Sequence, residues 1–263
     1  MKVIDLTPEH EQLYFVCLEE WSDEMKEAGN QKQLWFNDMK EKGLRVKLVL
    51  NDEGVIAGMI QYLPVEYSII EGKDLYFICC IWVHGHKAGR GDLSGKGLGT
   101  ALLEATEADV QSLGAKGIVA WGLEMPFWMT AAWYIKHGYE KIDSDGMAAL
   151  VWKTYADDAV PPKWIKPKKT PTPGENKLKI SVFVNGWCLD QNITYERIKR
   201  LAAKYPNTVL FEEYNTRDKA VMEEWGLSDA FYFDSEPVEF GPPPTYKLLK
   251  EILRKKLTER KLL

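Results

Sequence analysis

Three glycines at alternate positions are the residues best suited to chemistry: Gly95, Gly97 and Gly99 in Ser94-Gly-Lys-Gly-Leu-Gly-Thr100. Glycines let the backbone turn tightly and approach a ligand without obstruction by a Cβ atom. Exposed N–H groups on such a loop, at the positive end of a helix dipole, form an anion site suited to phosphate. We therefore expect this glycine loop to bind phosphate through its backbone.

Two common phosphate-binding motifs are excluded by neighbouring residues. The P-loop requires a glycine where Arg90 stands, and a Ser or Thr where Gly97 follows Lys96. The dinucleotide fingerprint requires a third glycine where Leu102 stands. The remaining pattern is x-G-x-G-x-G/A, closing directly into a helix.

The elements that must position this loop follow from hydrophobic patterning. The run from Leu75 to Val83 is rich in aromatic and β-branched residues and too short to span a bilayer, which predicts a buried strand. Apolar residues at helical spacing follow the loop up to Leu113. Between strand and loop, the stretch His84 to Leu93 is rich in glycine, which predicts a mobile segment that orders when the ligand of the loop binds.

The rest of the N-terminal part alternates between strands and helices. Thr7 and Pro8 predict the start of a first helix, whose apolar face extends to Met25. Further helices are expected around 34–39 and over 126–137. Strands are expected over 3–6, 45–50, 55–63, 117–123, 139–142 and 148–152, the second and third of them joined by a hairpin turn.

This order resembles the GCN5-related N-acetyltransferase (GNAT) family across about the first 155 residues. The glycine loop resembles the pyrophosphate-binding motif of that family. The stretch Ala132-Trp-Tyr-Ile-Lys-His-Gly-Tyr139 resembles its motif B. The resemblance implies an α/β fold with a mixed sheet and splayed central strands, acetyl-CoA as cosubstrate, and acetyl transfer to a primary amine of a small molecule or peptide.

The resemblance also implies site residues. The pantetheine arm would pair with the strand near Trp82 and Val83, and Tyr134 would donate a proton to the coenzyme A thiolate. Glu124 is the carboxylate expected to act as the base, with Glu66 and His84 as alternatives. The pyrophosphate would lie on the amides of Ser94, Gly95, Lys96, Gly97, Leu98, Gly99 and Thr100.

A composition shift separates a second part of the chain. We expect an acetyltransferase domain over 1–156, a Pro- and Lys-rich linker over 157–176, and a smaller domain over 177–263. The order of elements after Lys177, with Gly186-Trp-Cys188 after the first strand, resembles a thioredoxin-like layout of the YoaP-like type. Because no second cysteine follows Cys188, dithiol exchange is not expected.

Composition and charge exclude several classes of binding partner. The chain has 263 residues and a net charge of -5, so no basic field recruits nucleic acid or an anionic membrane. No run is long enough for a membrane span, and the N-terminus lacks the apolar core of a signal peptide. Four cysteines without a paired spacing predict a cytoplasmic protein with no metal site.

The sequence leaves two other functions open, as well as the acceptor and the oligomeric state. One is a non-catalytic protein that senses acetyl-CoA or acts as an adaptor. The other is a thiol-dependent activity centred on the C-terminal domain and Cys188.

Overall fold

The structure is a computed structural model, and it describes residues 1–125, 129–238 and 242–262. The chain divides into two compact units. The first holds residues 1–21 and 37–165, and the second holds residues 22–36 and 166–263. The compact units are groups of residues in contact, whereas the predicted domains, 1–156 and 177–263, are parts expected to fold independently. The predicted domain bounds stay a prediction.

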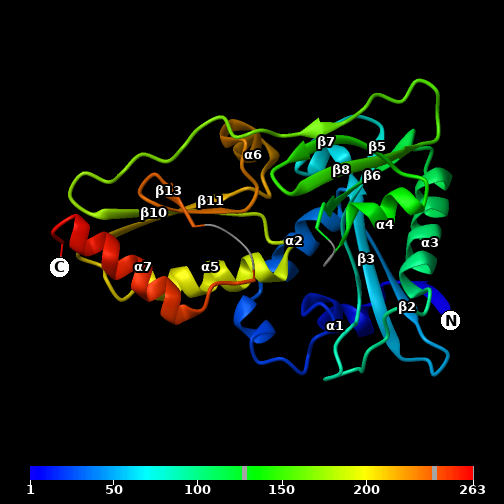
Figure 1. The fold of residues 1–263 in the computed structure, drawn as a ribbon, viewed down its shortest axis with the longest axis horizontal. Coiled ribbons are helices and arrows are strands. Elements are labelled where there is room, and N and C mark those ends of the chain that lie inside the picture. Colours follow the sequence, from blue (N-terminus) through cyan, green and yellow to red (C-terminus); the bar gives the residue numbers. More distant parts are fainter. Residues whose placement is uncertain (126–128, 239–241, 263) are drawn as a thin grey trace. The chain divides into compact units, whose positions relative to one another are not determined.

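A seven-stranded mixed sheet is the centre of the first unit, in the order β1-β2-β3-β5-β6-β8-β7 (Figure 1). Among its described strand pairs, β5 and β6 run parallel and the other pairs run antiparallel. The strands are β1 (Lys2–Asp5), β2 (Arg45–Leu50), β3 (Ile56–Pro64), β5 (Leu75–Val83), β6 (Gly117–Leu123), β7 (Glu140–Asp145) and β8 (Ala148–Thr154).

Helices cover both faces of this sheet. On one face, α3 (Leu98–Ser112) and α4 (Ala131–Lys136) bury side chains in the cluster that also holds Ile60 of β3. On the other face, the hydroxyl of Tyr14 in α1 (Glu11–Phe15) donates to Oε1 of Gln61 at 2.6 Å. Because neighbouring residues of a strand point to opposite faces, Ile60 and Gln61 mark the two sides.

The predicted strands over 45–50, 75–83 and 117–123 are confirmed. The predicted first helix is shorter than expected. A 3-10 turn (Pro8–His10) precedes α1, and the helix ends at Phe15 because Cys17 and Leu18 adopt positive φ angles of 51° and 64°. The predicted helix over 126–137 is described as α4 from Ala131 onward, and residues 126–128 lie outside the described residues.

The segment predicted as a linker has ordered contacts in its first half. There, β9 (Lys163–Trp164) pairs with β4 (Ile70–Glu71), which follows the short helix η3 (Val65–Tyr67). Trp164 and Ile165 are buried, so they act as apolar anchors that the Pro and Lys composition conceals.

A four-stranded sheet organises the second unit, in the order β11-β10-β12-β13. The strands β10 (Leu178–Val184) and β11 (Val209–Asn215) run parallel, whereas β12 (Ala230–Phe233) and β13 (Glu236–Pro237) add antiparallel. Helices α5 (Leu189–Ala202) and α7 (Tyr246–Glu259) lie side by side and bury apolar residues against this sheet (Figure 1). The helix α6 (Lys219–Trp225) follows β11. None of the described helices is long and apolar enough to cross a membrane.

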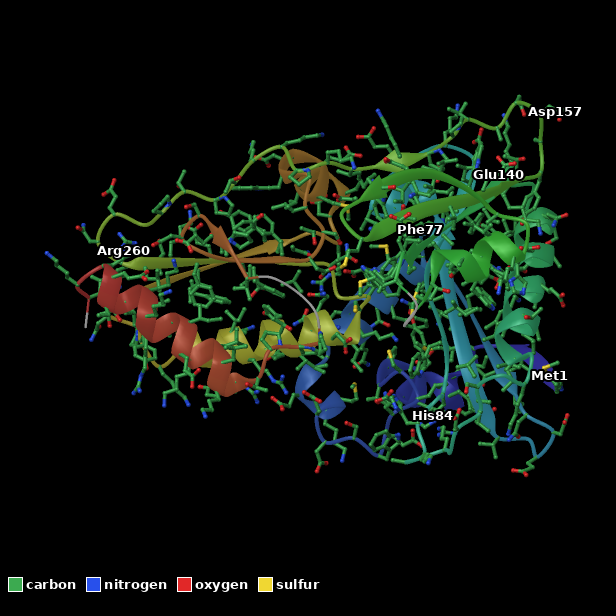
Figure 2. The ribbon with its side chains drawn as sticks, in the orientation of Figure 1. Met1, Phe77, His84, Glu140, Asp157 and Arg260 are labelled. Carbon is green, nitrogen blue, oxygen red and sulfur yellow. The ribbon has the colours of Figure 1, made fainter. Side chains whose placement is uncertain are left out.

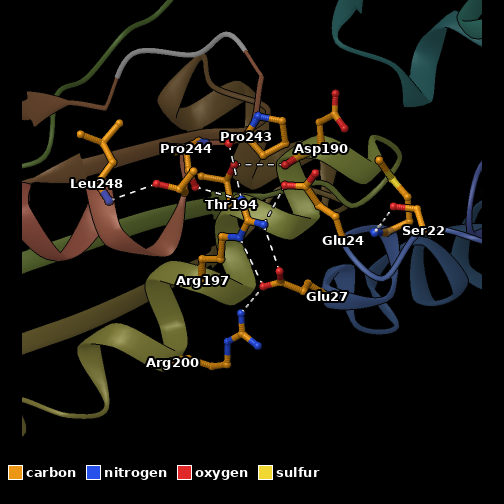
Figure 3. Close-up of polar contacts among 12 residues, drawn as sticks. Ser22, Glu24, Glu27, Asp190, Thr194, Arg197, Arg200, Pro243, Pro244 and Leu248 are labelled. Carbon is orange, nitrogen blue, oxygen red and sulfur yellow. Dashed lines mark hydrogen bonds and ion pairs between the residues drawn. The ribbon is translucent and has the colours of Figure 1, made fainter. Parts of the chain in front are cut away.

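Residues 22–36 group with this second unit through α5. They form the 3-10 helix η2 (Met25–Ala28) and the first part of α2 (Gln31–Lys40). The guanidinium of Arg197 bonds to Glu24 at 2.8 Å and Glu27 at 3.0 Å, and donates to the carbonyl oxygen of Pro244 at 3.0 Å (Figure 3). This network fixes the early segment on α5.

Candidate active site

The central strands part after a short paired stretch. Residues Leu75–Ile78 of β5 pair with Gly117–Ala120 of β6, and no pairing continues beyond them in the described strands. The register of β5 against β3 also shifts between Ile78 and Cys80, so Cys79 is the extra residue of a bulge. The indole N–H of Trp121 donates to the carbonyl oxygen of Cys79 at 2.9 Å. The gap between β5 and β6 therefore opens at Cys79.

The end of β5 turns polar backbone groups toward this gap. The amide of His84, just beyond the strand, donates to Ala57 of the β3 side at 2.9 Å (Figure 2 labels His84). Hydrogen-bonding directions alternate along an antiparallel strand, so the backbone N–H and C=O groups of Trp82, two residues earlier, also point toward β3. The N–H and C=O groups of Ile81 and the N–H of Val83 then face the gap, where an extended ligand chain can pair with them.

The glycine loop has the geometry of an anion site. Gly95 and Gly97 adopt φ angles of +71° and +77°, which disfavour other residues. Gly97 precedes α3, and its carbonyl accepts the amide of Ala101 at 3.0 Å. The amides of the first helical turn, from Leu98 to Thr100, therefore lack intrahelical acceptors and point along the helix axis. They carry the positive end of the dipole of a 15-residue helix.

Ser94 and Lys96 lie in the glycine loop but make different interactions there. The amide and the hydroxyl of Ser94 both donate to Oδ1 of Asp92, at 3.0 Å and 2.6 Å. These bonds hold the pKa of Asp92 below its usual value, so Asp92 is ionised and braces the loop. Lys96 is exposed on the loop and compensates this negative charge. The amide of Ser94 is thus engaged by Asp92.

A histidine that the sequence analysis did not single out joins the loop to α4. The two ring nitrogens of His137 contact the hydroxyl of Thr100 at 3.0 Å and the carbonyl oxygen of Trp133 at 2.8 Å. Nδ1 therefore donates to Trp133, and Nε2 accepts from Thr100. The Trp133 ring lies 3.5 Å from the position of a Cβ atom on Gly99. His137 and Trp133 position the start of α3, a role that only the fold reveals.

These elements surround a cavity of about 530 Å³. It is bounded by the end of β5, the glycine loop, the first turn of α3 and the start of α4. The residues that line it are Ile81, Trp82, Val83, Leu93, Ser94, Gly95, Gly97, Leu98, Gly99, Thr100, Met129, Thr130, Trp133 and Tyr134. Of the predicted phosphate-loop residues, all except Lys96 line the cavity, and so does Tyr134.

Tyr134 presents a buried phenol to this cavity. Its side chain is fully buried, and its hydroxyl has no hydrogen-bond partner among the described residues. Burial raises its pKa well above the ordinary tyrosine value, so the phenol stays protonated at neutral pH. An unpaired buried donor facing a cavity fits a ligand that supplies an acceptor atom.

The three candidate bases lie in different surroundings. Glu124 follows β6 at the open end of the gap, and its carboxylate contacts the ammonium of Lys141. Glu66 follows β3 near Tyr76, at the opposite end of β5, and accepts the amide of Asp74 at 3.1 Å. The side chain of His84 is satisfied, because Nδ1 lies 2.8 Å from the Gly91 carbonyl oxygen and Nε2 accepts from Trp21 at 3.2 Å.

The segment predicted to be mobile, His84 to Leu93, includes these contacts of His84. The amide of Leu93 also donates to the carbonyl oxygen of His84 at 2.9 Å, and Arg90 donates to the carbonyl oxygen of Ile56 at 3.1 Å. The loop is closed by these contacts, and its mobility stays a prediction. Among the residues that the structure describes, no group of three or more metal-ligating side chains gathers here or elsewhere.

The comparison with protein families identifies the first unit. Residues 5–139 match the model of the Acetyltransferase (GNAT) family, which is more than half of the chain. The chain belongs to the GNAT family. The mixed sheet with parted central strands and the glycine loop at the start of α3 are thus those of a GNAT acetyltransferase, and the protein is an acyltransferase. No curated protein matches the sequence.

Solved structures with a similar fold include several GNAT proteins. A putative acetyltransferase from Desulfovibrio desulfuricans is 19% identical, with a TM-score of 0.44, over 58% of this chain and 98% of that one. A GNAT acetyltransferase from Brucella melitensis, in complex with acetyl-CoA, is 16% identical, with a TM-score of 0.39, over 61% and 90%. The PaiA N-acetyltransferase from Thermoplasma acidophilum, in complex with coenzyme A, is 16% identical, with a TM-score of 0.43, over 59% and 100%.

Proposed function

We propose that the protein transfers the acetyl group of acetyl-CoA directly to a primary amine, with both substrates bound together. The observation that carries this proposal is one cavity that joins three features. They are the free amides at the start of α3, the open edge of β5 and the buried phenol of Tyr134. The diphosphate of the cofactor needs the free amides, its peptide-like arm needs the open strand edge, and the leaving thiolate needs the phenol.

The backbone supplies most of the proposed cofactor site. The pyrophosphate would accept hydrogen bonds from the amides of Gly95 to Thr100, with Lys96 adding positive charge from the loop. The pantetheine arm would pair with Ile81 and Val83 as an added strand. Ser94 contributes through Asp92, which fixes the conformation of the loop.

The proposed reaction needs no covalent enzyme intermediate. The neutral amine attacks the thioester carbon, the new C–N bond forms, and the C–S bond breaks. Tyr134 donates its proton to the leaving thiolate and is reprotonated from solvent. The proton released by the amine passes through solvent to the carboxylate of Glu124, which lies at the open end of β6 and contacts the ammonium of Lys141.

Two measurements test this function together. Titration calorimetry of the 263-residue protein with coenzyme A should detect binding, and acetyl-CoA with a panel of amines should release free thiol. Binding without thiol release for any amine would instead indicate an acetyl-CoA sensor. Absence of both heat and thiol release would refute the proposal.

For the second unit we propose a thioredoxin-like fold of the YoaP-like type. The parallel pair β10 and β11, followed by antiparallel β12 and β13, supports this assignment, as does Cys188 at the N-cap of α5. The four cysteines are not joined in disulfides, which supports a cytoplasmic location. A Cys188→Ser variant that keeps full acetyl transfer would exclude a thiol-dependent step in this reaction.

A further inference from the structure

His137 and Thr100 form a hydrogen-bonded pair where α4 ends beside the first turn of α3, and the proposed reaction does not use the histidine. Nε2 of His137 lies 3.0 Å from the hydroxyl of Thr100, and Nδ1 lies 2.8 Å from the carbonyl oxygen of Trp133. A carbonyl oxygen only accepts, so Nδ1 carries a hydrogen whether the ring is neutral or charged. The charge of His137 therefore decides only what Nε2 does at Thr100.

The hydroxyl of Thr100 has a single hydrogen, and the charge of His137 decides where it points. Beside a neutral ring, the hydroxyl donates to Nε2, and its hydrogen is not available to a ligand. Beside a charged ring, Nε2 donates to the hydroxyl oxygen, and the hydrogen of the hydroxyl is released. Because Thr100 lines the cavity, the released hydrogen can be donated to an acceptor there. The pair therefore offers an additional donor to an anion when His137 is protonated.

The surroundings of the His137 ring suit a positive charge. The indole of Trp133 lies against it, with ring centroids 4.3 Å apart and planes inclined at 44°. The faces of aromatic rings attract cations. His137 is also the C-cap of α4, and positive charge is favourable at the carboxyl end of a helix. Since the residue is half-buried, solvent can deliver a proton to it.

The charged residues on the elements that meet here balance one another. Lys153 of β8 donates to the carbonyl oxygen of His137 at 3.3 Å and to the carboxylate of Glu107 in α3 at 2.8 Å. Lys136 precedes His137 in α4, and Glu104 belongs to α3; both are exposed. These elements thus carry two cations and two carboxylates. An anion bound in the cavity would change this balance in favour of protonation.

We propose that His137 takes up a proton from solvent when coenzyme A binds, and that the imidazolium turns the hydroxyl of Thr100 to donate to the diphosphate. This inference rests on the proposed function, which assigns the diphosphate to the first turn of α3. The diphosphate supplies both an acceptor for the hydroxyl and the negative charge that favours protonation. Histidine is the side chain that ordinarily changes charge near neutral pH. His137 is therefore a positioning residue of the cofactor site.

Calorimetry of the 263-residue protein in buffers of different ionisation enthalpy measures this proton, because each proton that the protein takes up is released by the buffer. The ligands are coenzyme A and dephospho-coenzyme A, which keeps the diphosphate but lacks the 3′-phosphate, a group that itself titrates near neutral pH. We expect uptake of up to about one proton with either ligand, and an association constant that falls by up to about tenfold per pH unit as the pH rises from about 6 to 8.

Two outcomes of this experiment would overturn the proposal in different ways. Binding of both ligands without proton uptake anywhere in that pH range would overturn the role of His137 and leave the proposed function intact. Absence of binding of either ligand would overturn it together with the proposed function.

Variants of the pair locate the proton. The amide of His137→Gln can donate to Thr100 but cannot take up a proton, so this variant should bind dephospho-coenzyme A without uptake and with an affinity that hardly changes with pH. Thr100→Val should lose the uptake and bind about tenfold more weakly, because the hydroxyl is gone. Thr100→Ser keeps a hydroxyl and should restore both.

His10→Gln is the matched control. Nδ1 of His10 contacts the hydroxyl of Thr7 at 2.7 Å, and neither residue is among the described residues that line the cavity. This variant should keep the proton uptake and the pH dependence of the wild type. Wild-type uptake in His137→Gln, or loss of uptake in His10→Gln, would overturn the assignment of the proton to His137.

Discussion

Replacing Tyr134 by Phe should make the protein more stable and the enzyme slower. The hydroxyl of Tyr134 is buried and has no hydrogen-bond partner among the described residues. A buried polar group without a partner costs about 1–3 kcal/mol of stability. Phe keeps the ring contacts with Trp133 and Tyr139, whose centroids lie at 5.0 Å and 5.3 Å. We therefore expect the free energy of unfolding to rise by about 1–2 kcal/mol.

The same change removes the proposed proton donor. Loss of a general acid typically lowers the rate about 10²- to 10⁴-fold. We expect kcat for thiol release to fall within that range, while coenzyme A affinity in calorimetry stays unchanged because the phosphate site is elsewhere. The burial that raises the pKa of Tyr134 also disfavours a bare thiolate, so proton transfer between the two remains feasible.

Urea unfolding and steady-state kinetics on Tyr134→Phe separate these effects. Tyr139→Phe is the matched control, because Tyr139 contacts the same ring but does not line the cavity, and it should keep the wild-type kcat. An unchanged kcat in Tyr134→Phe would refute the proton-donor role. A less stable Tyr134→Phe would show that the hydroxyl has a partner in the folded protein.

Three further predictions follow from particular contacts. Gly97→Ala should weaken coenzyme A binding about tenfold in calorimetry, because left-handed backbone costs alanine roughly 1–2 kcal/mol; Gly54→Ala, with a similar φ of +79° and open space at a Cβ, should keep the affinity. Arg197→Ala should lower the free energy of unfolding in urea by about 3 kcal/mol, since its side chain is 6% exposed, whereas Arg200→Ala, at 51% exposed, should lower it by less than about 1 kcal/mol. Burial raises the pKa of Asp229 to about 6, so the folded protein holds this proton more tightly than the unfolded chain and loses stability as the pH rises from about 4 to 6. Asp229→Asn should flatten this loss, at most about 3 kcal/mol, in urea unfolding measured across that range. An unchanged pH profile in Asp229→Asn would contradict the role of Asp229. Equal losses of stability in the two arginine variants would contradict the importance of burial at Arg197. Full coenzyme A affinity in Gly97→Ala would contradict the role of the left-handed backbone.

Local patterning predicted the strands and the glycine loop well. The run Leu75 to Val83 is apolar throughout because β5 is central in the sheet. Its residue types therefore predict a buried strand. The backbone adopts a positive φ at Gly97, a conformation that the glycine residue type indicates. Such features depend on neighbours in sequence, so periodicity and residue type are enough to find them.

Features that depend on distant partners were not predicted. The first helix has the apolar spacing to continue past Phe15, but Cys17 and Leu18 turn the chain so that Trp21 reaches His84. His84 was a candidate base, and only the fold shows that both of its ring nitrogens are engaged. The role of His137 likewise depends on Thr100, which lies 37 residues away along the chain.

The grouping of residues 22–36 with the second unit has a consequence for synthesis of the chain. The chain passes between the units at 21–22, 36–37 and 165–166. As translation proceeds, η2 with the buried Ala28 emerges long before α5, the helix that it contacts. A nascent chain stopped at residue 165 has η2 but not α5, so we expect it to bind chaperones more strongly than the 263-residue chain.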